Sequence, residues 1–168
     1  MWWWAAAALA QTCDTARLGE LPETLSVAWV SPLGRRSGGR WLWVEPTAEL
    51  RTLARASATE GRLLQALGLR NRNTDPHRRW KVVVFDVDRT ALCRPVPEVT
   101  ERTAVAGVGA CDGRRSPDPD RGQACGPRVD RASGEPTIQT LRAEWPSLAS
   151  QGFCVLPLER FVSEATRR

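Results

Sequence analysis

Several residue types are scarce in this chain of 168 residues, and each scarcity excludes a class of site. His77 is the only histidine, and no two cysteines have the C-x-x-C spacing, so no structural zinc site is visible. No run approaches the roughly 18 apolar residues that a membrane-spanning helix needs, so we expect no membrane span. The five cysteines are scattered and odd in number, which argues against a disulfide framework and favours a reducing compartment. The expected location is therefore cytoplasmic or nuclear.

The basic charge is carried almost entirely by arginine and is concentrated in the middle of the chain. Lys81 is the only lysine among 24 basic residues. Residues 35–81 hold eleven basic and four acidic residues, a net charge of +7, whereas residues 1–34 carry −2 and residues 82–168 are neutral. Such a segment attracts phosphates or acidic partners, mostly without sequence preference. The alternative is a solvated arginine-rich face that binds nothing in particular.

Composition divides the chain into four segments. Residues 1–21 are an N-terminal apolar segment that favours a short helix, with a weak secretion signal as the alternative. Residues 22–92 predict a small α/β unit. Residues 93–136 predict a disordered linker, because residues 107–136 combine six Gly and four Pro with many charges and few large apolar side chains. Residues 137–168 predict short helix and strand remnants.

The periodicity of apolar residues indicates the elements of the small unit. Leu25, Val27 and Trp29 alternate along the first strand of a hairpin over residues 24–45. Residues 47–67 predict one helix, or two shorter ones since Gly61 weakens the middle, with Thr47 as a cap and Gly68 as a C-terminal stop. Residues 82–85 form a continuous apolar run that is typical of a strand buried on both faces. Further along, we expect a short helix in 137–150, a strand at 153–156 and a last helical turn or two at 158–165.

The expected fold class is therefore α/β or α+β. It consists of a small β-hairpin–helix–strand unit followed by a largely disordered tail rich in Gly, Pro and Arg.

One short motif points to chemistry. The apolar strand 82–85 leads into Asp86 and Asp88, which are separated by one residue, and then into Thr90. This arrangement resembles the first motif of haloacid dehalogenase-like phosphohydrolases. The resemblance implies a central parallel strand, with Asp86 as nucleophile, Asp88 as general acid and base, Thr90 in the loop or on the phosphate, and Mg²⁺ on Asp86 and Asp88. The alternative is that both acids cap a turn at a strand end.

A second candidate site is a basic and aromatic cluster before the same strand. Arginine contacts phosphate and tryptophan stacks on bases, so the cluster indicates contact with RNA or single-stranded DNA, or with an acidic protein. Trp80 has the alternative of being a core residue. The leading prediction is a non-enzymatic binding protein that acts through this segment or the Trp-rich hairpin, and an incomplete Mg²⁺-dependent phosphohydrolase-like domain is the second. The cluster comprises Arg70, Arg72, Arg78, Arg79, Trp80 and Lys81.

Overall fold

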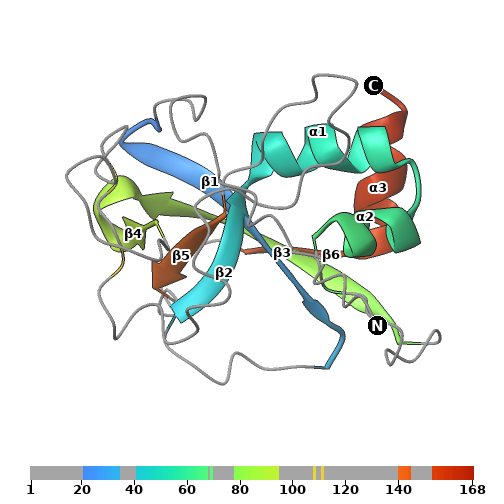
Figure 1. Ribbon diagram of the computed structural model, residues 1–168, viewed down its shortest axis with the longest axis horizontal. Coiled ribbons are helices and arrows are strands. Elements are labelled where there is room, and N and C mark those ends of the chain that lie inside the picture. Colours follow the sequence, from blue (N-terminus) through green and yellow to red (C-terminus); the bar gives the residue numbers. More distant parts are fainter. Residues whose placement is uncertain are drawn as a thin grey trace, which may run out of the picture.

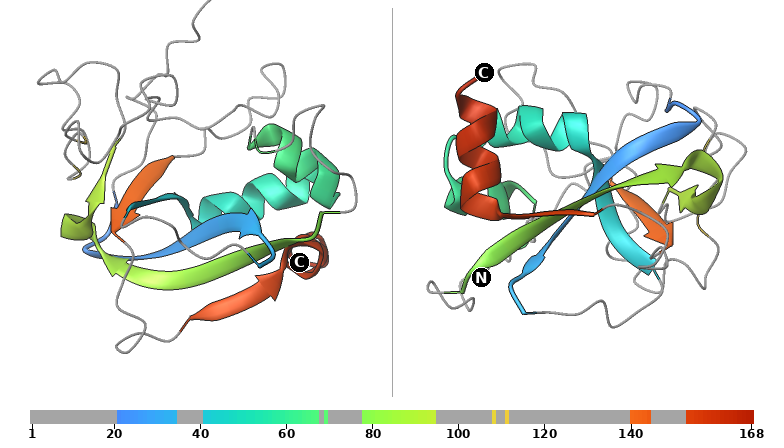
Figure 2. Two further views of the ribbon diagram at one scale, coloured as in Figure 1. Left: turned by 90° about the horizontal axis from the view of Figure 1, so that it is seen from below. Right: turned by 180° about the vertical axis from the view of Figure 1, so that it is seen from behind.

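The sheet of this protein contains six strands, which all pair antiparallel in the order β4-β5-β2-β1-β3-β6 (Figures 1 and 2). The computed structural model describes residues 21–34, 41–67, 69, 78–94, 108, 111, 140–144 and 153–168. Within these residues there are also three α-helices, so the fold is α+β, which confirms one of the two expected classes. The elements are β1 (Thr24–Pro32), β2 (Trp41–Pro46), α1 (Thr47–Ser57), α2 (Glu60–Ala66), β3 (Trp80–Asp88), the 3₁₀ turn η2 (Arg89–Ala91), β4 (Leu92–Cys93), β5 (Leu141–Glu144), β6 (Cys154–Pro157) and α3 (Leu158–Thr166).

Strand β3 lies inside the sheet, as its apolar run predicted. It pairs with β1 along its whole length and with β6 from Lys81 to Val84. Val82, Val83 and Phe85 are each at most 3% exposed, because consecutive side chains of this strand point into cores on opposite faces. Both neighbours run antiparallel to β3, so the strand is not the central parallel strand that the phosphohydrolase resemblance implies.

The predicted hairpin of β1 and β2 is paired only over a short stretch. The two strands meet at the pairs Val27–Pro46 and Ala28–Glu45. Strand β1 otherwise follows β3, whereas β2 pairs with β5 through residues 41–44. The sheet therefore divides into one half made of β1, β3 and β6 and another made of β2, β5 and β4, and Figure 1 shows how strongly the two halves are twisted apart.

The helical segment contains two helices, which was the second of the expected arrangements. The break falls at Ala58, whose backbone is left-handed with φ of 61°, and the side chain of Thr59 caps α2 by accepting from the Arg62 N–H. The predicted cap at Thr47 is wrong, because Pro46 occupies the N-cap position. The Thr47 hydroxyl instead lies 2.9 Å from the hydroxyl of Ser26 on β1. The expected stop at Gly68 lies outside the described residues.

Two apolar cores form on the two faces of the sheet. The helix-side core joins the helices, which gather at one end of the sheet (Figure 2), to alternate residues of β1 and β3. The second core joins the other residues of β1 and β3 to β2, β4 and β5. The helix-side core consists of Ala28, Val30, Leu50, Leu53, Ala54, Leu63, Leu64, Trp80, Val82, Leu158, Phe161, Val162 and Ala165. The second core consists of Leu21, Val27, Leu42, Val44, Val83, Phe85, Val87, Leu92, Val108, Leu141 and Ala143.

Residues 140–144 and 153–168, in the last third of the chain, belong to this fold. The prediction of a helix in residues 137–150 is wrong for β5, which is a strand paired with β2. Leu141 and Ala143 alternate into the second core, and β2 offers them an unpaired edge, so tertiary pairing overrides the local helical pattern. Strand β6 confirms the strand predicted at 153–156, and helix α3 confirms the helical turns predicted at 158–165. Helix α3 adds its apolar side chains to the helix-side core, which therefore extends beyond the predicted unit of residues 22–92. The predicted short helix of residues 1–21 lies outside the described residues except for Leu21. In the predicted disordered linker of residues 93–136, Cys93, Arg94, Val108 and Cys111 are described and buried, and the other residues lie outside the described part of the chain.

Candidate functional site

The motif acids lie within strand β3, not beyond its end. Asp86 and Asp88 are exposed, whereas the alternating Phe85 and Val87 are buried in the second core. Positions 86 and 88 share a face with Trp80 and Val82, which pack under the helices. Because that face is buried at the start of the strand and exposed at its end, the two carboxylates face solvent.

Asp88 caps the 3₁₀ turn that follows the strand. One of its carboxylate oxygens accepts from the Thr90 N–H at 2.8 Å and from the Thr90 hydroxyl at 2.7 Å. These two hydrogen bonds, side chain first, lower the pKa of Asp88, with a smaller contribution from the Arg89 charge. Arg89 itself donates to the Leu21 carbonyl oxygen at 2.9 Å. Asp88 and Thr90 are thus brought together, but in the geometry of a turn cap.

A magnesium ion would be held by oxygen ligands, of which protein carboxylates commonly supply one or two. Asp86 and Asp88 are carboxylates on the same face of β3, and one oxygen of Asp88 is engaged with Thr90. Among the residues that the structure describes, no three His, Cys, Asp or Glu side chains gather in a way that could hold a metal.

The predicted basic cluster is divided between the surface and the core. Arg78 and Arg79 are exposed at the start of β3, and the Arg79 carbonyl accepts from the Leu33 N–H at 2.8 Å. Lys81 is half-buried, with its ammonium 5.7 Å from the centre of the Trp29 ring. Trp80 is only 8% exposed in the helix-side core, which corrects its predicted stacking role. Arg70 and Arg72 lie outside the described residues.

Two buried ionisable residues, Glu45 and Arg94, were missed by the sequence analysis. Glu45, at the end of β2, stands opposite Ala28 of the helix-side core and is 8% exposed. Burial first, and the charge of Glu49 second, raise the pKa of Glu45 to about 8, so this carboxyl holds a proton at neutral pH. In sequence, the only signal is an acid that follows a strand rich in Trp and Val, which is also the pattern of a solvated strand end.

Arg94, directly after β4, is the second buried ionisable residue. Its side chain is 1% exposed, and its three guanidinium nitrogens have no hydrogen-bond partner among the described residues. Burial lowers the pKa of Arg94, while the charge of Glu49 opposes that change. A buried polar group without a partner costs about 1–3 kcal/mol, and more when it is charged. In a chain so rich in arginine, nothing in the sequence marks this one.

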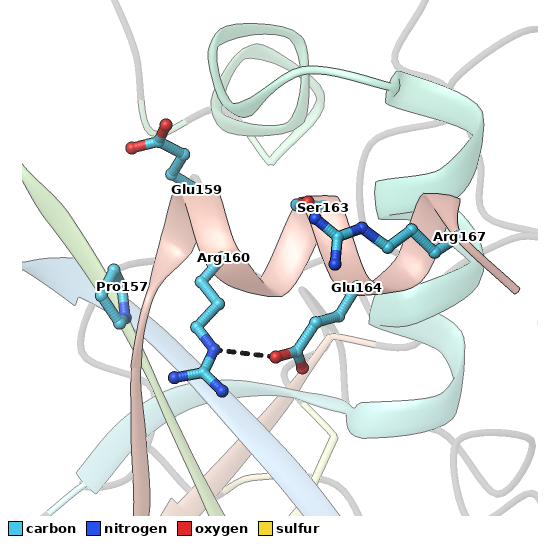
Figure 3. A pocket seen from close by; sticks show the side chains of 6 residues that line it. All are labelled: Pro157, Glu159, Arg160, Ser163, Glu164 and Arg167. Atoms are coloured by element: carbon cyan, nitrogen blue, oxygen red, sulfur yellow. Dashed lines mark hydrogen bonds and ion pairs between the residues drawn. The ribbon is translucent and has the colours of Figure 1, made fainter.

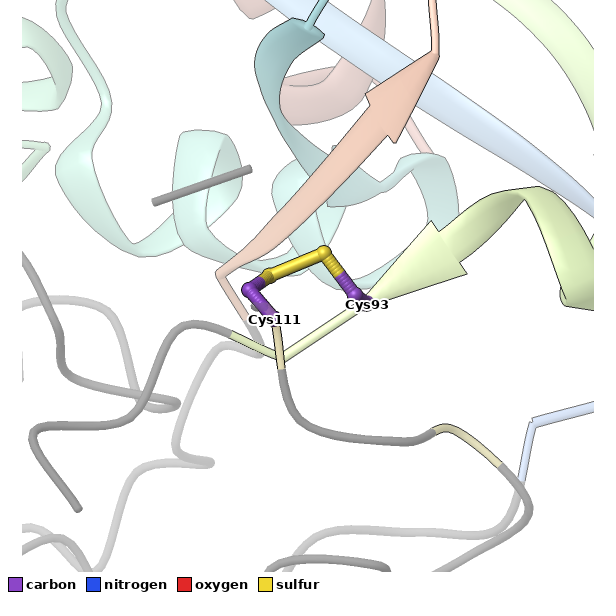
Figure 4. The surroundings of a disulfide bond; sticks show 2 residues. All are labelled: Cys93 and Cys111. Carbon is purple, nitrogen blue, oxygen red and sulfur yellow. A yellow bond between two sulfur atoms is a disulfide. The ribbon is translucent and has the colours of Figure 1, made fainter. Parts of the chain in front are cut away.

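A disulfide joins Cys93 to Cys111 beside Arg94 (Figure 4). The sequence argued against a disulfide framework and did not predict this bond, whereas Cys154 on β6 is free and exposed. The partners are 18 residues apart in sequence and meet only because the chain returns to the edge of the sheet. A cross-link that closes a loop of this length contributes about 3 kcal/mol in the chain-entropy model.

The outer face of α3 carries a shallow depression (Figure 3). Two of its charged side chains form an ion pair, in which the Arg160 Nε donates to a carboxylate oxygen of Glu164 at 2.8 Å. Both side chains are largely solvated, so this pair has little energetic weight. The depression is lined by Pro157, Glu159, Arg160, Ser163, Glu164 and Arg167.

Comparisons with known proteins add no assignment to these sites. No protein-family model, curated protein or solved structure matches this chain. No helix in the part of the chain that the structure describes is both long and apolar enough to cross a membrane.

Proposed function

We propose that this chain is a non-enzymatic binding protein whose basic middle segment contacts the phosphate backbone of single-stranded nucleic acid. The observation that carries this proposal is the pair Arg78 and Arg79, two neighbouring exposed guanidinium groups at the start of β3. The hydrogen bond from Leu33 to the Arg79 carbonyl fixes the backbone beneath them. A guanidinium that stands on an ordered backbone loses less entropy when it binds phosphate than one on a flexible segment.

The surrounding sequence supports the same chemistry. Residues 35–81 carry the +7 charge, and two of its segments, 35–40 and 70–77, join the described chain beside Gly34 and Arg78. Because Trp80 is buried, the interaction proposed is electrostatic and has no base-stacking component from that ring. Binding of this kind depends steeply on salt and weakly on sequence.

The test is a titration of a fluorescent single-stranded RNA at several salt concentrations. Replacing Arg78 and Arg79 with alanine should lower affinity and reduce the slope of log K against log salt by about 1.4, since each single-strand phosphate contact contributes about 0.7. The matched control replaces Arg167 and Arg168, which are also neighbouring, exposed and described. Equal losses in both double variants, or tighter binding to an acidic polypeptide than to RNA, would overturn the proposal.

The cellular compartment that we propose for this protein is the cytoplasm or the nucleus. A cytoplasmic or nuclear site would give access to RNA. A stable Cys93–Cys111 bond is more typical of oxidising compartments. Alkylation of free thiols in freshly lysed cells, followed by mass analysis of the two cysteines, distinguishes these locations.

The second candidate is the phosphohydrolase-like activity, favoured only by the exposure of Asp86 and Asp88 on the same face of β3. In this reading Asp86 would take the phosphoryl group of a phosphate monoester as the P–O bond to the alcohol breaks, and Asp88 would protonate the leaving alcohol. Asp88 would then deprotonate a water that releases phosphate from Asp86, and Mg²⁺ held by the two acids would offset the phosphate charge. Hydrolysis of a generic phosphomonoester that requires Mg²⁺ and disappears in Asp86→Asn would support it. Absent turnover, or turnover that Asp86→Asn leaves unchanged, would reject it.

A further inference from the structure

The segment around the disulfide is attached to the sheet by few contacts. Strand β4 has two residues and lies at the edge of the sheet, where it pairs only with β5. On the other side of the bond, the Cys111 N–H donates to the Arg94 carbonyl at 2.7 Å, and Val108 is buried in the second core. The covalent bond is therefore a large part of what holds this edge in place.

Arg94 opposes the closed arrangement. Its guanidinium is fully buried without a hydrogen-bond partner among the described residues, and it would regain its hydration if the edge opened. The contribution expected of the disulfide and the cost expected of the buried guanidinium are similar in size. Loss of the bond would thus remove a large contribution that offsets the buried charge, whereas the attraction of Glu49 would still favour the closed arrangement.

The helix-side core does not include this edge, whereas Leu92 and Val108 share the second core with residues of β1 and β3. None of β4, Val108 and Cys111 belongs to the helix-side core, and the nine-residue ladder between β1 and β3 lies away from β4 in the strand order. An opening limited to one edge is a form of local unfolding, which costs less than global unfolding.

We propose that the Cys93–Cys111 disulfide is a redox-sensitive latch. Its reduction releases β4 from β5 and Cys111 from the Arg94 carbonyl. Arg94 is then exposed to solvent, while β1, β3, β6 and the helices stay folded. In the reducing step a thiolate of a dithiol attacks one sulfur, and the S–S bond breaks through a mixed disulfide. Two electrons and two protons pass to Cys93 and Cys111, and the dithiol closes to its own disulfide. Because both cysteines are at most 5% exposed, the attack requires a transient opening of the edge.

The test compares the oxidised and the reduced full-length chain after alkylation has verified the state of both thiols. Phenylglyoxal labels accessible guanidinium groups, and mass spectrometry reads the modification at Arg94. Labelling of Arg94 should rise at least tenfold on reduction, whereas that of exposed Arg78 should not change. Hydrogen exchange should increase in β4 and β5 and stay slow in β1 and β3.

Two variants separate the latch from a general structural staple. Cys93→Ser combined with Cys111→Ser should behave like the reduced chain, and Cys154→Ser like the parent. Arg94→Met removes the buried charge, so β4 should stay protected after reduction in that variant. The proposal is overturned if Arg94 remains unlabelled once both thiols are free, if β1 and β3 lose protection together with β4, or if Arg94→Met opens as readily as the parent. It is overturned too if the air-oxidised chain keeps both thiols free.

Discussion

Replacement of Glu45 with glutamine should make the protein more stable at alkaline pH. Glutamine has nearly the shape of a protonated glutamic acid, and the pKa of Glu45 is raised from 4.5 to about 8 by burial and by Glu49. The folded chain therefore holds a proton that the unfolded chain releases above pH 4.5. Stability must fall as pH rises between these two values, since the unfolded state binds fewer protons there.

The size of this effect follows from the two pKa values. One pKa unit corresponds to about 1.4 kcal/mol, so the rise from 4.5 to about 8 amounts to about 5 kcal/mol of lost stability above pH 8. At pH 7 the loss is about 3 kcal/mol. These are large fractions of the 5–15 kcal/mol that a domain typically has. Glu45→Gln should abolish this loss, so the variant should exceed the parent by several kcal/mol at pH 8 and differ little from it near pH 4.5.

The assay is urea unfolding followed by tryptophan fluorescence at steps from pH 4.5 to pH 9. Glu23→Gln is the matched control, because its carboxylate is exposed and its variant should follow the parent. Glu49→Gln should make the decline of stability smaller and end at a lower pH, since one cause of the raised folded-state pKa is then removed while its onset at the unfolded pKa is unchanged. Parallel curves for the parent and Glu45→Gln across this range would refute the buried protonated carboxyl.

Three further predictions concern single positions in the fold. Ala58→Gly should stabilise the chain by up to about 1 kcal/mol, because the left-handed backbone at φ 61° strains any residue with a Cβ. The control Ala56→Gly, inside α1, should destabilise the chain by about 1 kcal/mol in the same urea assay. Phe85→Ala should cost about 3–5 kcal/mol, while Val155→Ala, 57% exposed, should change stability by at most about 0.5 kcal/mol. Because the pKa of Asp88 is lowered in the folded chain, its carboxylate stabilises the fold above its ordinary pKa, and this stability is lost as pH falls through the folded-state pKa. Asp88→Asn should therefore flatten the acid side of a plot of melting temperature against pH. An unchanged acid side would contradict the capping bond.

Local sequence patterns were sufficient to predict the helices and strands that bury periodic or continuous apolar residues. Strand β3, both helices of residues 47–66 and helix α3 are all visible in the spacing of Val, Leu and Phe. Strand β5 was not visible, because four residues carry too little periodicity and its pairing partner lies about a hundred residues earlier in the chain. The Cys93–Cys111 bond was hidden for the same reason, since it depends on where the chain returns and not on local spacing.

For charged residues too, local sequence could not predict which side chains are buried. Asp86, Asp88 and Glu45 all sit in or at the end of apolar strands, and their sequence contexts are alike. Asp86 and Asp88 face solvent, whereas Glu45 stands opposite Ala28 in the helix-side core. Which acid is buried was decided by tertiary packing, and that packing determines which of them changes its pKa.

Glu49 acts on both buried ionisable residues, Glu45 and Arg94, that the sequence did not reveal. Its negative charge raises the pKa of Glu45 and also opposes the lowering of the Arg94 pKa, so both groups lie within its electrostatic reach. If reduction of the disulfide moves Arg94 into solvent, Glu49 loses a nearby positive charge while Glu45 remains in the core. A carboxylate without that countercharge repels the ionised form of Glu45 more strongly, so the pKa of Glu45 should be higher in the reduced chain. The profiles of unfolding free energy against pH should then differ between the oxidised and the reduced parent and coincide in Arg94→Met. Such a result would show that the charge of Arg94 links the disulfide to the protonation of Glu45.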